Sequence, residues 1–155
     1  LFFKTVQNKI HYGVHGHTAA EVIMQRADAT KNNMGLTAFE GAKVRKKDVD
    51  IAKNYLDEDE MQELNRVVTM YLDFAEDQAR RHIPMYMKDW ETYLNNFLDM
   101  TGREVLSDAG HISAQQAKAH AYEQYELYDE NRKKIEANEV DLLVEETEQI
   151  KDEIN

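Results

Sequence analysis

The chain has 155 residues, a formal net charge of -11 and no cysteine, so it fits one ordinary domain and can form neither a disulfide framework nor a thiolate metal site. Hydrophobic residues make up 42% and charged residues 32%, a balance typical of a folded chain with a modest core. The acidic excess disfavours nucleic-acid binding through bulk charge. Apolar runs stay far below the ~20 residues of a membrane span. We therefore expect no membrane association and a cytoplasmic location, with which the lack of cysteine agrees.

The acidic residues are unevenly distributed along the chain. Residues 119–155 hold twelve acidic and four basic residues, whereas residues 1–118 hold 18 and 15. The larger part is therefore nearly neutral and has room for a local basic patch. The chain begins at Leu1 without an initiator Met or the layout of a signal peptide, so we interpret it as a piece of a longer protein.

Helical periodicity dominates the sequence. Apolar residues recur at spacings of three and four, and Pro84 is the only proline, which predicts a compact all-α domain of about five to six helices with a long, partly projecting C-terminal helix. The first helix should end near Gly13 or Gly16. Thr18 and Glu21 form a capping box that should open the second helix. The residues predicted to face inward from these two helices are Phe3, Val6, Ile10, Val22, Ile23 and Ala27.

The middle of the chain alternates weak and strong helical signals. Residues 28–41 are rich in turn formers and predict a loop, and a short helix is predicted from about Lys46 to Tyr55. Asp57 and Glu60 then form the start signal of the clearest helix, which should end at residues 82–84. Its predicted inward stripe is Met61, Leu64, Val68, Tyr71, Ala75 and Ala79.

The last third predicts two more helices. Gly102 should cap the helix that carries the stripe Trp90, Leu94, Phe97 and Leu98, and Ser113 with Gln116 should open the final helix. We interpret residues 1–112 as a helical core domain and residues 113–155 as a long acidic helix that serves oligomerisation or docking. Its second half carries a heptad seam, which needs a partner surface. The seam residues are Val140, Leu143, Thr147, Ile150 and Ile154.

A step of five residues separates Ile135 from Val140. The two halves of the last helix therefore cannot share one straight apolar face without a bend or a change of phase. We expect this tail to project from the body or to dock on another subunit, so the protein is predicted to be a homo-oligomer through its C-terminal helix.

Three of the six histidines, His11, His15 and His17, fall within seven residues. On a continuous helix His11 and His15 would share a face, as paired zinc ligands do, but the glutamate of a His-Glu-x-x-His motif is replaced by Tyr12. Polar or capping roles are favoured over a metal site, for which His11 and His15 are the candidate ligands. His15, His17 and Glu21 are the catalytic candidates, and no cofactor is predicted.

Residues 13–18 precede a helix N-terminus, where exposed N–H groups attract anions. Their glycine spacing matches neither a dinucleotide-binding motif nor a P-loop. A two-glycine turn with a capping box is the favoured interpretation, and an anion site is the alternative.

Lysine and arginine cluster densely at one place in the sequence. Such a cluster could hold a nucleic-acid backbone or an acidic partner, although four charges at a helix start are typical of a solvated surface. The candidate residues for anion or nucleic-acid binding are Lys43, Arg45, Lys46 and Lys47, with Arg80 and Arg81 expected to lie near them in space.

Several long stretches resemble the C-terminal half of the RhuM family of bacterial virulence-associated proteins. The resemblance runs from about Leu1 to Asp108, and past Ser113 only a general likeness remains. The stretches that carry it include Asn33-Met34-Gly35-Leu36-Thr37, Ile51-Ala52-Lys53-Asn54-Tyr55-Leu56 and Met70-Tyr71-Leu72-Asp73-Phe74-Ala75-Glu76-Asp77-Gln78-Ala79-Arg80-Arg81.

The resemblance implies a protein about twice this length, whose other half resembles a helix-turn-helix DNA-binding module. The family name carries no established activity. Some relatives are linked to Fic-type nucleotidyl transferases, but this sequence has no His-Pro-Phe followed by Gly-Asn-Gly, so no Fic catalysis is assigned.

Two hypotheses follow from these features. The first is an interaction or assembly module of a larger DNA-binding protein, with nucleic acid contacted through the half that this sequence does not contain. The alternative is a small toxin-like enzyme that acts on nucleotide or nucleic acid through His11, His15, His17 and Glu21. No Gly-x-Ser-x-Gly motif and no cysteine are present, which argues against hydrolases with those nucleophiles.

Overall fold

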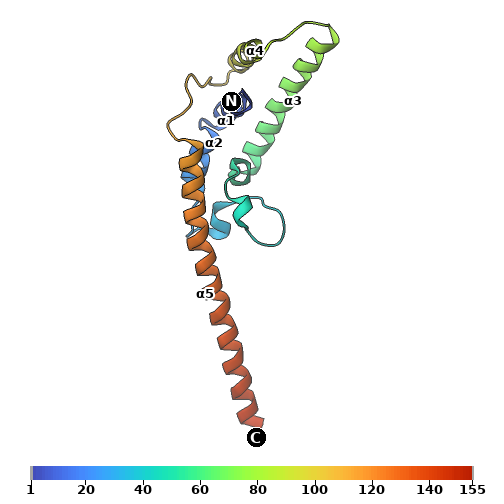
Figure 1. Cartoon of the computed structure of the whole chain (residues 1–155). Helices are drawn as coiled ribbons and strands as arrows, with labels where there is room; N and C mark the ends of the chain where they lie inside the picture. The colour runs from blue at the N-terminus through green and yellow to red at the C-terminus, as the bar shows by residue number, and fades with distance from the viewer. Residues whose placement is uncertain (1, 155) are drawn as a thin grey trace.

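The computed structural model describes residues 2–154, and the side chains of residues 4–154. In this part of the chain all regular structure is helical, and the predicted all-α class is confirmed (Figure 1). The side chain of Phe3, which was predicted to face inward, lies outside the described residues. The helices are α1 (Phe2–His15), α2 (Ala19–Arg26), α3 (Glu58–Arg80), α4 (Met87–Met100) and α5 (Ala114–Ile154), with short 3-10 turns η1 (Asn32–Gly35), η2 (Lys46–Asp48) and η3 (Ala52–Tyr55).

The turn between α1 and α2 forms at the predicted glycine. Helix α1 ends at His15, and Gly16 follows in a left-handed conformation (φ 79°) with its N–H donating to the Tyr12 carbonyl at 2.8 Å. Thr18 is the N-cap of α2, because its hydroxyl accepts a hydrogen bond from the Glu21 backbone N–H at 3.3 Å. Local chemistry therefore places the bend between these two helices.

The predicted loop at residues 28–41 is irregular apart from η1, and it contains an unusual run of left-handed residues. Asn33, Met34 and Gly35 have φ values of 52°, 60° and 88°. A Cβ on Gly35 would lie 2.2 Å from the Arg26 carbonyl oxygen, so only glycine fits there. This tight passage lets the Met34 side chain enter the core, where it is fully buried.

The predicted short helix from Lys46 to Tyr55 is wrong. Two separate 3-10 turns form instead, with Ile51 extended between them (φ -110°, ψ 108°). Polar side chains take over the backbone groups that a helix would use. The Asp48 carboxylate accepts from the Arg45 N–H at 2.8 Å, and the Asn54 amide donates to the Asp48 carbonyl at 2.9 Å.

Helix α3 opens with the predicted reciprocal cap. The Asp57 carboxylate accepts from the Glu60 N–H at 2.8 Å, and Glu60 accepts from the Asp57 N–H at 3.0 Å. The predicted inward stripe is confirmed in part, since Leu64 and Tyr71 are buried and Met61, Val68 and Ala75 are partly buried. Val67 and Gln78, which the predicted stripe did not include, are buried as well. The predicted Ala79 is exposed, because the chain reverses over its neighbour Gln78, whose carbonyl accepts from the Ile83 N–H at 3.0 Å.

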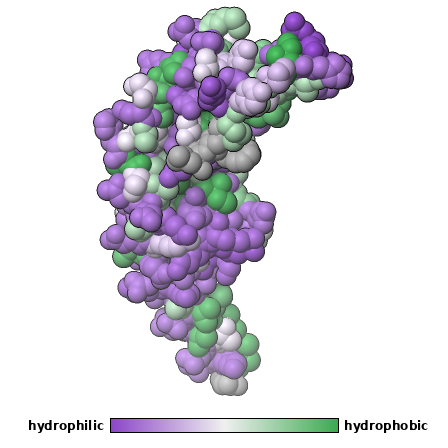
Figure 2. Space-filling model, turned by 45° about the horizontal axis from the view of Figure 1, so that its top comes forward, coloured by the Kyte–Doolittle hydropathy of each residue, from purple (hydrophilic) through white to green (hydrophobic). Residues whose placement is uncertain are grey.

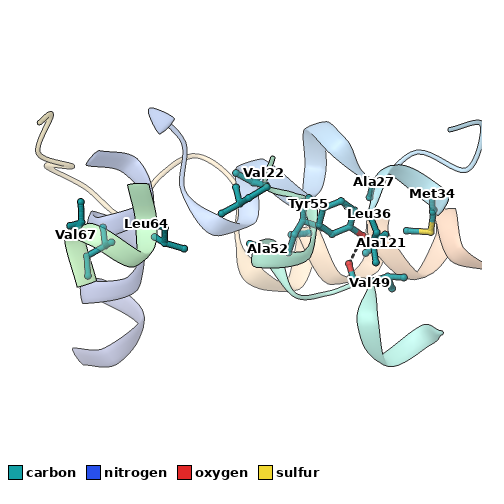
Figure 3. Packing of buried hydrophobic residues seen from close by; sticks show 14 of the residues in the cluster. Val22, Ala27, Met34, Leu36, Val49, Ala52, Tyr55, Leu64, Val67 and Ala121 are labelled. Carbon is teal, nitrogen blue, oxygen red and sulfur yellow. Dashed lines mark hydrogen bonds between the residues drawn. The ribbon is translucent and has the colours of Figure 1, made fainter. Parts of the chain in front are cut away.

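The core joins two groups of packed helices. Helix α1 packs against α3 and α4, whereas α2 packs against the first turns of α5 and against η3. Figure 3 shows Tyr55 among Ala27, Leu36 and Ala121, and its hydroxyl donates to the Val49 carbonyl at 2.6 Å. The predicted residues of α4 also bury well, since Leu94 and Leu98 are both 0% exposed.

Helix α5 is continuous over 41 residues and begins at the predicted Ser113 and Gln116 cap. Its first turns place Ala117 and Ala121 in the core, whereas every residue from 133 to 154 is exposed. The tail projects from the body as expected (Figure 1). The helix continues without a bend, and its two halves differ in phase. At 100° per residue, the seam of the second half points roughly 70° away from the side of the first half that packs on the body. The division at residue 112 stays a prediction.

Candidate functional sites

The structure brings the histidine cluster together at the end of α1. His11 Nδ1 lies 3.0 Å from His15 Nε2 in a hydrogen bond, and the His15 and His17 rings are 6.0 Å apart between centroids. His17 Nδ1 in turn lies 3.7 Å from Glu21 Oε2. All four sequence candidates therefore lie in one row that starts inside the body at His11 and reaches solvent at His17, with no hydrogen bond between the described atoms of His15 and His17.

Burial controls the charge of the two inner histidines. Removal from water and, to a smaller extent, the nearby charge of Lys53 lower the pKa of His11 to about 4. Burial also lowers the pKa of His15 to about 4, with the neighbouring His11 as the next cause. Both rings are therefore neutral near pH 7. His15 Nδ1 is buried and has no hydrogen-bond partner among the described residues.

An ion pair that the sequence did not reveal lies beside His15. Arg26 Nη1 and Nη2 donate to the two Glu60 carboxylate oxygens at 2.6 and 2.8 Å, and Nη1 also donates to the Tyr55 carbonyl at 3.0 Å. The hydrogen bond from Arg26 holds the pKa of Glu60 down at about 2. The charge of Glu60 raises the pKa of His15, and the charge of Arg26 lowers it. No local signal could have found this pair, because its members are 34 residues apart.

The chemistry available inside this row is proton exchange along the hydrogen bond between the neutral His11 and His15 rings. In the described part of the chain no group of three or more His, Asp or Glu side chains is arranged to hold a metal ion. Two carboxylates that follow the histidines in the sequence bond elsewhere, since Asp28 accepts from Thr30 at 2.6 Å and Glu40 accepts from Lys47 at 2.9 Å, and Glu21 contacts the row at His17. The role of the row as a catalytic or metal site stays a prediction.

Two N–H groups in the first turn of α2, directly after residues 13–18, form hydrogen bonds within the chain. The Ala19 N–H donates to Asn8 Oδ1 at 3.4 Å, and the Glu21 N–H donates to the Thr18 hydroxyl. These bonds match the favoured interpretation as a turn with a cap, and the alternative of an anion site there stays untested.

The basic cluster is largely neutralised by acidic neighbours. Arg45 and Lys47 contact Glu40 at 3.7 and 2.9 Å, and Lys46 contacts Glu126 at 3.7 Å. Lys43 is exposed. The structure therefore offers a balanced surface here, and nucleic-acid binding by these residues stays a prediction.

Arg80 and Arg81 do not join this cluster. They lie at the C-terminal end of α3, whereas residues 43–47 lie beyond its N-terminal end (Figure 1). Each arginine pairs along its own helix, Arg80 with Glu76 at 2.8 Å and Arg81 with Asp77 at 3.6 Å. The expectation that these arginines lie close to the lysines is therefore wrong, because the 23-residue helix holds the two groups apart.

The projecting part of α5 is the largest unpartnered feature of the described chain. Its apolar side chains alternate with acidic ones in the space-filling view, where green patches follow the narrow end of the molecule (Figure 2). Val140, Leu143, Ile150 and Ile154 are between 56% and 78% exposed. Side chains of this size are seldom gathered on a helix that only faces water.

Comparison with known proteins gives one match. The model of the virulence protein RhuM family covers residues 1–136, which extends beyond the stretch of resemblance recognised in the sequence. No curated protein and no solved structure matches the chain. Among the described helices, none combines the length and the apolar character that a membrane crossing requires. The match spans most of the chain, so this protein belongs to the RhuM family of virulence proteins.

Proposed function

We propose that this chain is an assembly module in which the α5 tails of two copies pair in parallel. The proposal rests on the exposed seam in the projecting part of α5, which has no neighbour among the described residues. In this seam Leu143 is 62% and Ile154 is 78% exposed. Two such seams facing each other would remove this apolar surface from water, which stabilises a complex in proportion to the buried area.

The side chains of the seam favour two strands. With Val140 at heptad position a, Thr147 and Ile154 also fall at a, and Leu143 and Ile150 fall at d. Branched side chains at a with leucine at d are typical of parallel two-stranded coiled coils. The Thr147 hydroxyl donates to the Leu143 carbonyl at 2.7 Å, so this polar residue can enter the interface with its donor already satisfied.

The flanking charges favour the parallel direction. Glu146 lies at position g and Lys151 at position e, so in a parallel pair each Glu146 faces Lys151 of the second copy. An antiparallel pair would bring Glu146 against its own counterpart and Lys151 against its own counterpart. The parallel arrangement therefore replaces two repulsions with two attractions.

The tail also lacks support of its own. Residues 136–154 contain eight acidic residues and one lysine, and acidic residues follow each other at i,i+4 in Asp141 with Glu145 and in Glu148 with Asp152. Like charges at this spacing weaken an isolated helix. A paired tail would gain the stabilisation that its own sequence does not supply.

Parallel pairing would set the two bodies side by side at one end of the coil. The family resemblance implies a helix-turn-helix half in longer members, and two such halves held together would suit a DNA site with twofold symmetry. DNA binding is part of this proposal and rests on the resemblance.

Sedimentation equilibrium tests the pairing with two neighbouring leucines of equal exposure. Leu143 lies in the seam and Leu142 lies outside it, at 62% and 59% exposed. We expect concentration-dependent dimers, weakened at least tenfold in Leu143→Ser and unchanged in Leu142→Ser, because only the first loses buried apolar area in both copies. Monomers at all concentrations, or equal effects of the two variants, would contradict the proposal.

Salt and charge changes test the arrangement of the two tails. The net charge of the tails opposes pairing, so association should tighten when sodium chloride is raised from about 50 to about 500 mM. Lys151→Glu should weaken the dimer, and the additional change Glu146→Lys should restore it. Self-association that weakens with salt would contradict this arrangement, because it would show that attraction between unlike charges outweighs the repulsion between the acidic tails.

A second candidate function remains, and one observation favours it. The row His11, His15, His17 and Glu21 is assembled, and an inner imidazole has a buried nitrogen without a partner. An enzyme acting on nucleotide or nucleic acid could use this row for proton transfer. If His15→Ala and His17→Ala leave the effect of the full-length protein in cells unchanged while the fold is kept, this alternative fails.

A further inference from the structure

A cavity of about 770 Å³ lies between α1, α2, the segment at residues 50–53 and the start of α5. Its size falls in the range of small-molecule sites. It does not include the histidine row, and the exposed seam of α5 lies elsewhere on the molecule. The inference drawn from it is therefore independent of the assembly proposed above.

A buried lysine lines this cavity. Lys9 is 6% exposed, and its ammonium donates to the Leu106 carbonyl at 2.7 Å. No carboxylate of the described residues lies within 4 Å of this ammonium. An ammonium has three donors, and a charge held away from water is costly unless it is paired. Lys9 therefore has the capacity to bind an anion.

Three further lysines line the cavity without an acidic partner. No described carboxylate lies within 4 Å of Lys4, Lys53 or Lys118. The acidic residues of the lining already accept hydrogen bonds, Asp108 from the Gly110 N–H at 2.8 Å and Asp50 from the Tyr122 hydroxyl at 3.5 Å.

Positive charge in excess is unusual for this molecule. The chain has a formal charge of -11, and buried or half-buried arginines elsewhere, such as Arg26 and Arg103, sit on carboxylates. The cavity keeps its lysines unpaired despite the many acidic residues available. A concave, net-positive site in an acidic protein concentrates anions locally.

Part of the remaining lining is small and apolar, beside polar residues such as Asn8, Ser113 and Gln116. Ala19, Ala20, Ala52 and Ala117 contribute short side chains, and Ile23 adds a larger apolar surface. Short side chains leave space that a ligand can fill, and apolar walls suit a flat or aliphatic body. The lining thus combines one buried cation with an apolar bed.

We propose that this cavity binds a small organic anion whose phosphate or carboxylate group meets Lys9 and Lys53 and whose apolar body lies on the alanines of α2 and α5. The anionic group takes up donors of the Lys9 ammonium that the Leu106 carbonyl leaves available. Lys4 and Lys118 add attraction from the rim.

Titration of the ¹⁵N-labelled chain with phenyl phosphate and with benzoate tests this proposal and distinguishes the two anionic groups. We expect saturable shifts of the amides of Ala19, Ala20 and Ala117 with at least one of these probes. Phenol has the same ring without the charge and should bind at least tenfold more weakly, because a charge-assisted hydrogen bond is lost. Inorganic phosphate should also bind more weakly, since it leaves the apolar walls unfilled.

Variants assign the binding to the lysines. Lys9→Met should weaken the tighter probe about tenfold, and Lys53→Gln about threefold, since an exposed charge contributes less. Lys88→Gln, an exposed lysine on α4 outside the cavity, is the matched control and should leave binding unchanged. If Lys9→Met does not fold, Lys53→Gln against Lys88→Gln decides. No saturable shift at the cavity amides, or equal loss in these two variants, overturns the proposal.

Discussion

The two halves of α5 belong to the same helix and yet have opposite surroundings. Ala117 and Ala121 are at most 1% exposed under α2, whereas Leu143 and Ile150 are more than half exposed. Both halves carry apolar residues at helical spacing, so periodicity alone does not decide what is buried. The difference teaches that burial depends on whether another element lies opposite the apolar face, and within the described chain only the first half has one.

The largest effect of a substitution on the free energy of unfolding is expected for a leucine in the core. Leu98 is 0% exposed on α4, so Leu98→Ala should lower the free energy of unfolding by about 3 kcal/mol through lost transfer energy and a cavity. Urea denaturation of the dilute chain measures it. A loss below about 1 kcal/mol would mean that the body is loosely packed and that the contrast with the tail is smaller than the structure indicates.

Two glycines of the body allow the cost of backbone strain to be measured apart from the cost of a steric clash. Gly35 and Gly102 both have positive φ, but an added Cβ meets the Arg26 carbonyl at 2.2 Å in the first and nothing within 4 Å in the second. We expect Gly35→Ala to cost about 3 kcal/mol and Gly102→Ala about 1 kcal/mol, since a left-handed residue alone costs about 1–2 kcal/mol. Equal losses in urea titrations would show that the 28–41 loop yields easily.

The buried histidines make the stability of the body depend on pH. His11 has a pKa of about 4 in the folded chain against an ordinary value of 6.5, so the unfolded chain binds the proton more tightly. Stability is therefore complete above pH 6.5 and falls as the pH drops toward 4. We expect His11 to contribute a loss of about 2 kcal/mol between pH 7 and pH 5, and the less buried His15 to add a smaller one, both measured by urea denaturation.

Substitution assigns this pH dependence to the buried ring. His11→Gln should remove the larger part of this loss between pH 7 and pH 5 and leave the smaller part that His15 contributes, whereas His111→Gln, at an exposed position, should leave the profile as it is. A profile that His11→Gln does not change would place its origin in the carboxylates.

The smallest effect on folding is expected in the tail. Leu143→Ala should change the unfolding of the dilute chain by less than about 0.5 kcal/mol, because the side chain is 62% exposed and has no core neighbour to lose. If the tails pair, Leu143→Ala should lower the stability of the chain measurably at high chain concentration. A large loss in dilute solution would show that the tail folds back on the body, which would remove the contrast altogether.

Features that depend on nearby residues were predictable from the sequence. The caps at Asp57 with Glu60 and at Ser113 with Gln116 form as predicted, and Gly16 and Gly102 turn the chain where they should. The His11 and His15 contact also follows from their spacing on one helix. Such features depend on bonds within about four residues, so a sequence pattern suffices to find them.

Features that depend on distant residues were missed or wrong. Nothing near Arg26 announces its pairing with Glu60, and the separation of Arg80 and Arg81 from the basic loop is set by the direction of α3. The turns at residues 46–55 replaced a predicted helix because side-chain hydrogen bonds and burial of Tyr55 outweighed weak helical propensity.

By itself, the sequence determined the all-α class, the caps and turns, the seam of the tail and the local row of histidines, because each rests on interactions between residues close in the chain. Only the tertiary structure decided which half of α5 is buried, which ion pair stands beside His15, and that unpaired lysines from distant segments share one cavity. Those outcomes depend on how helices pack against one another, and this packing is set by the whole core and by no single stretch of sequence.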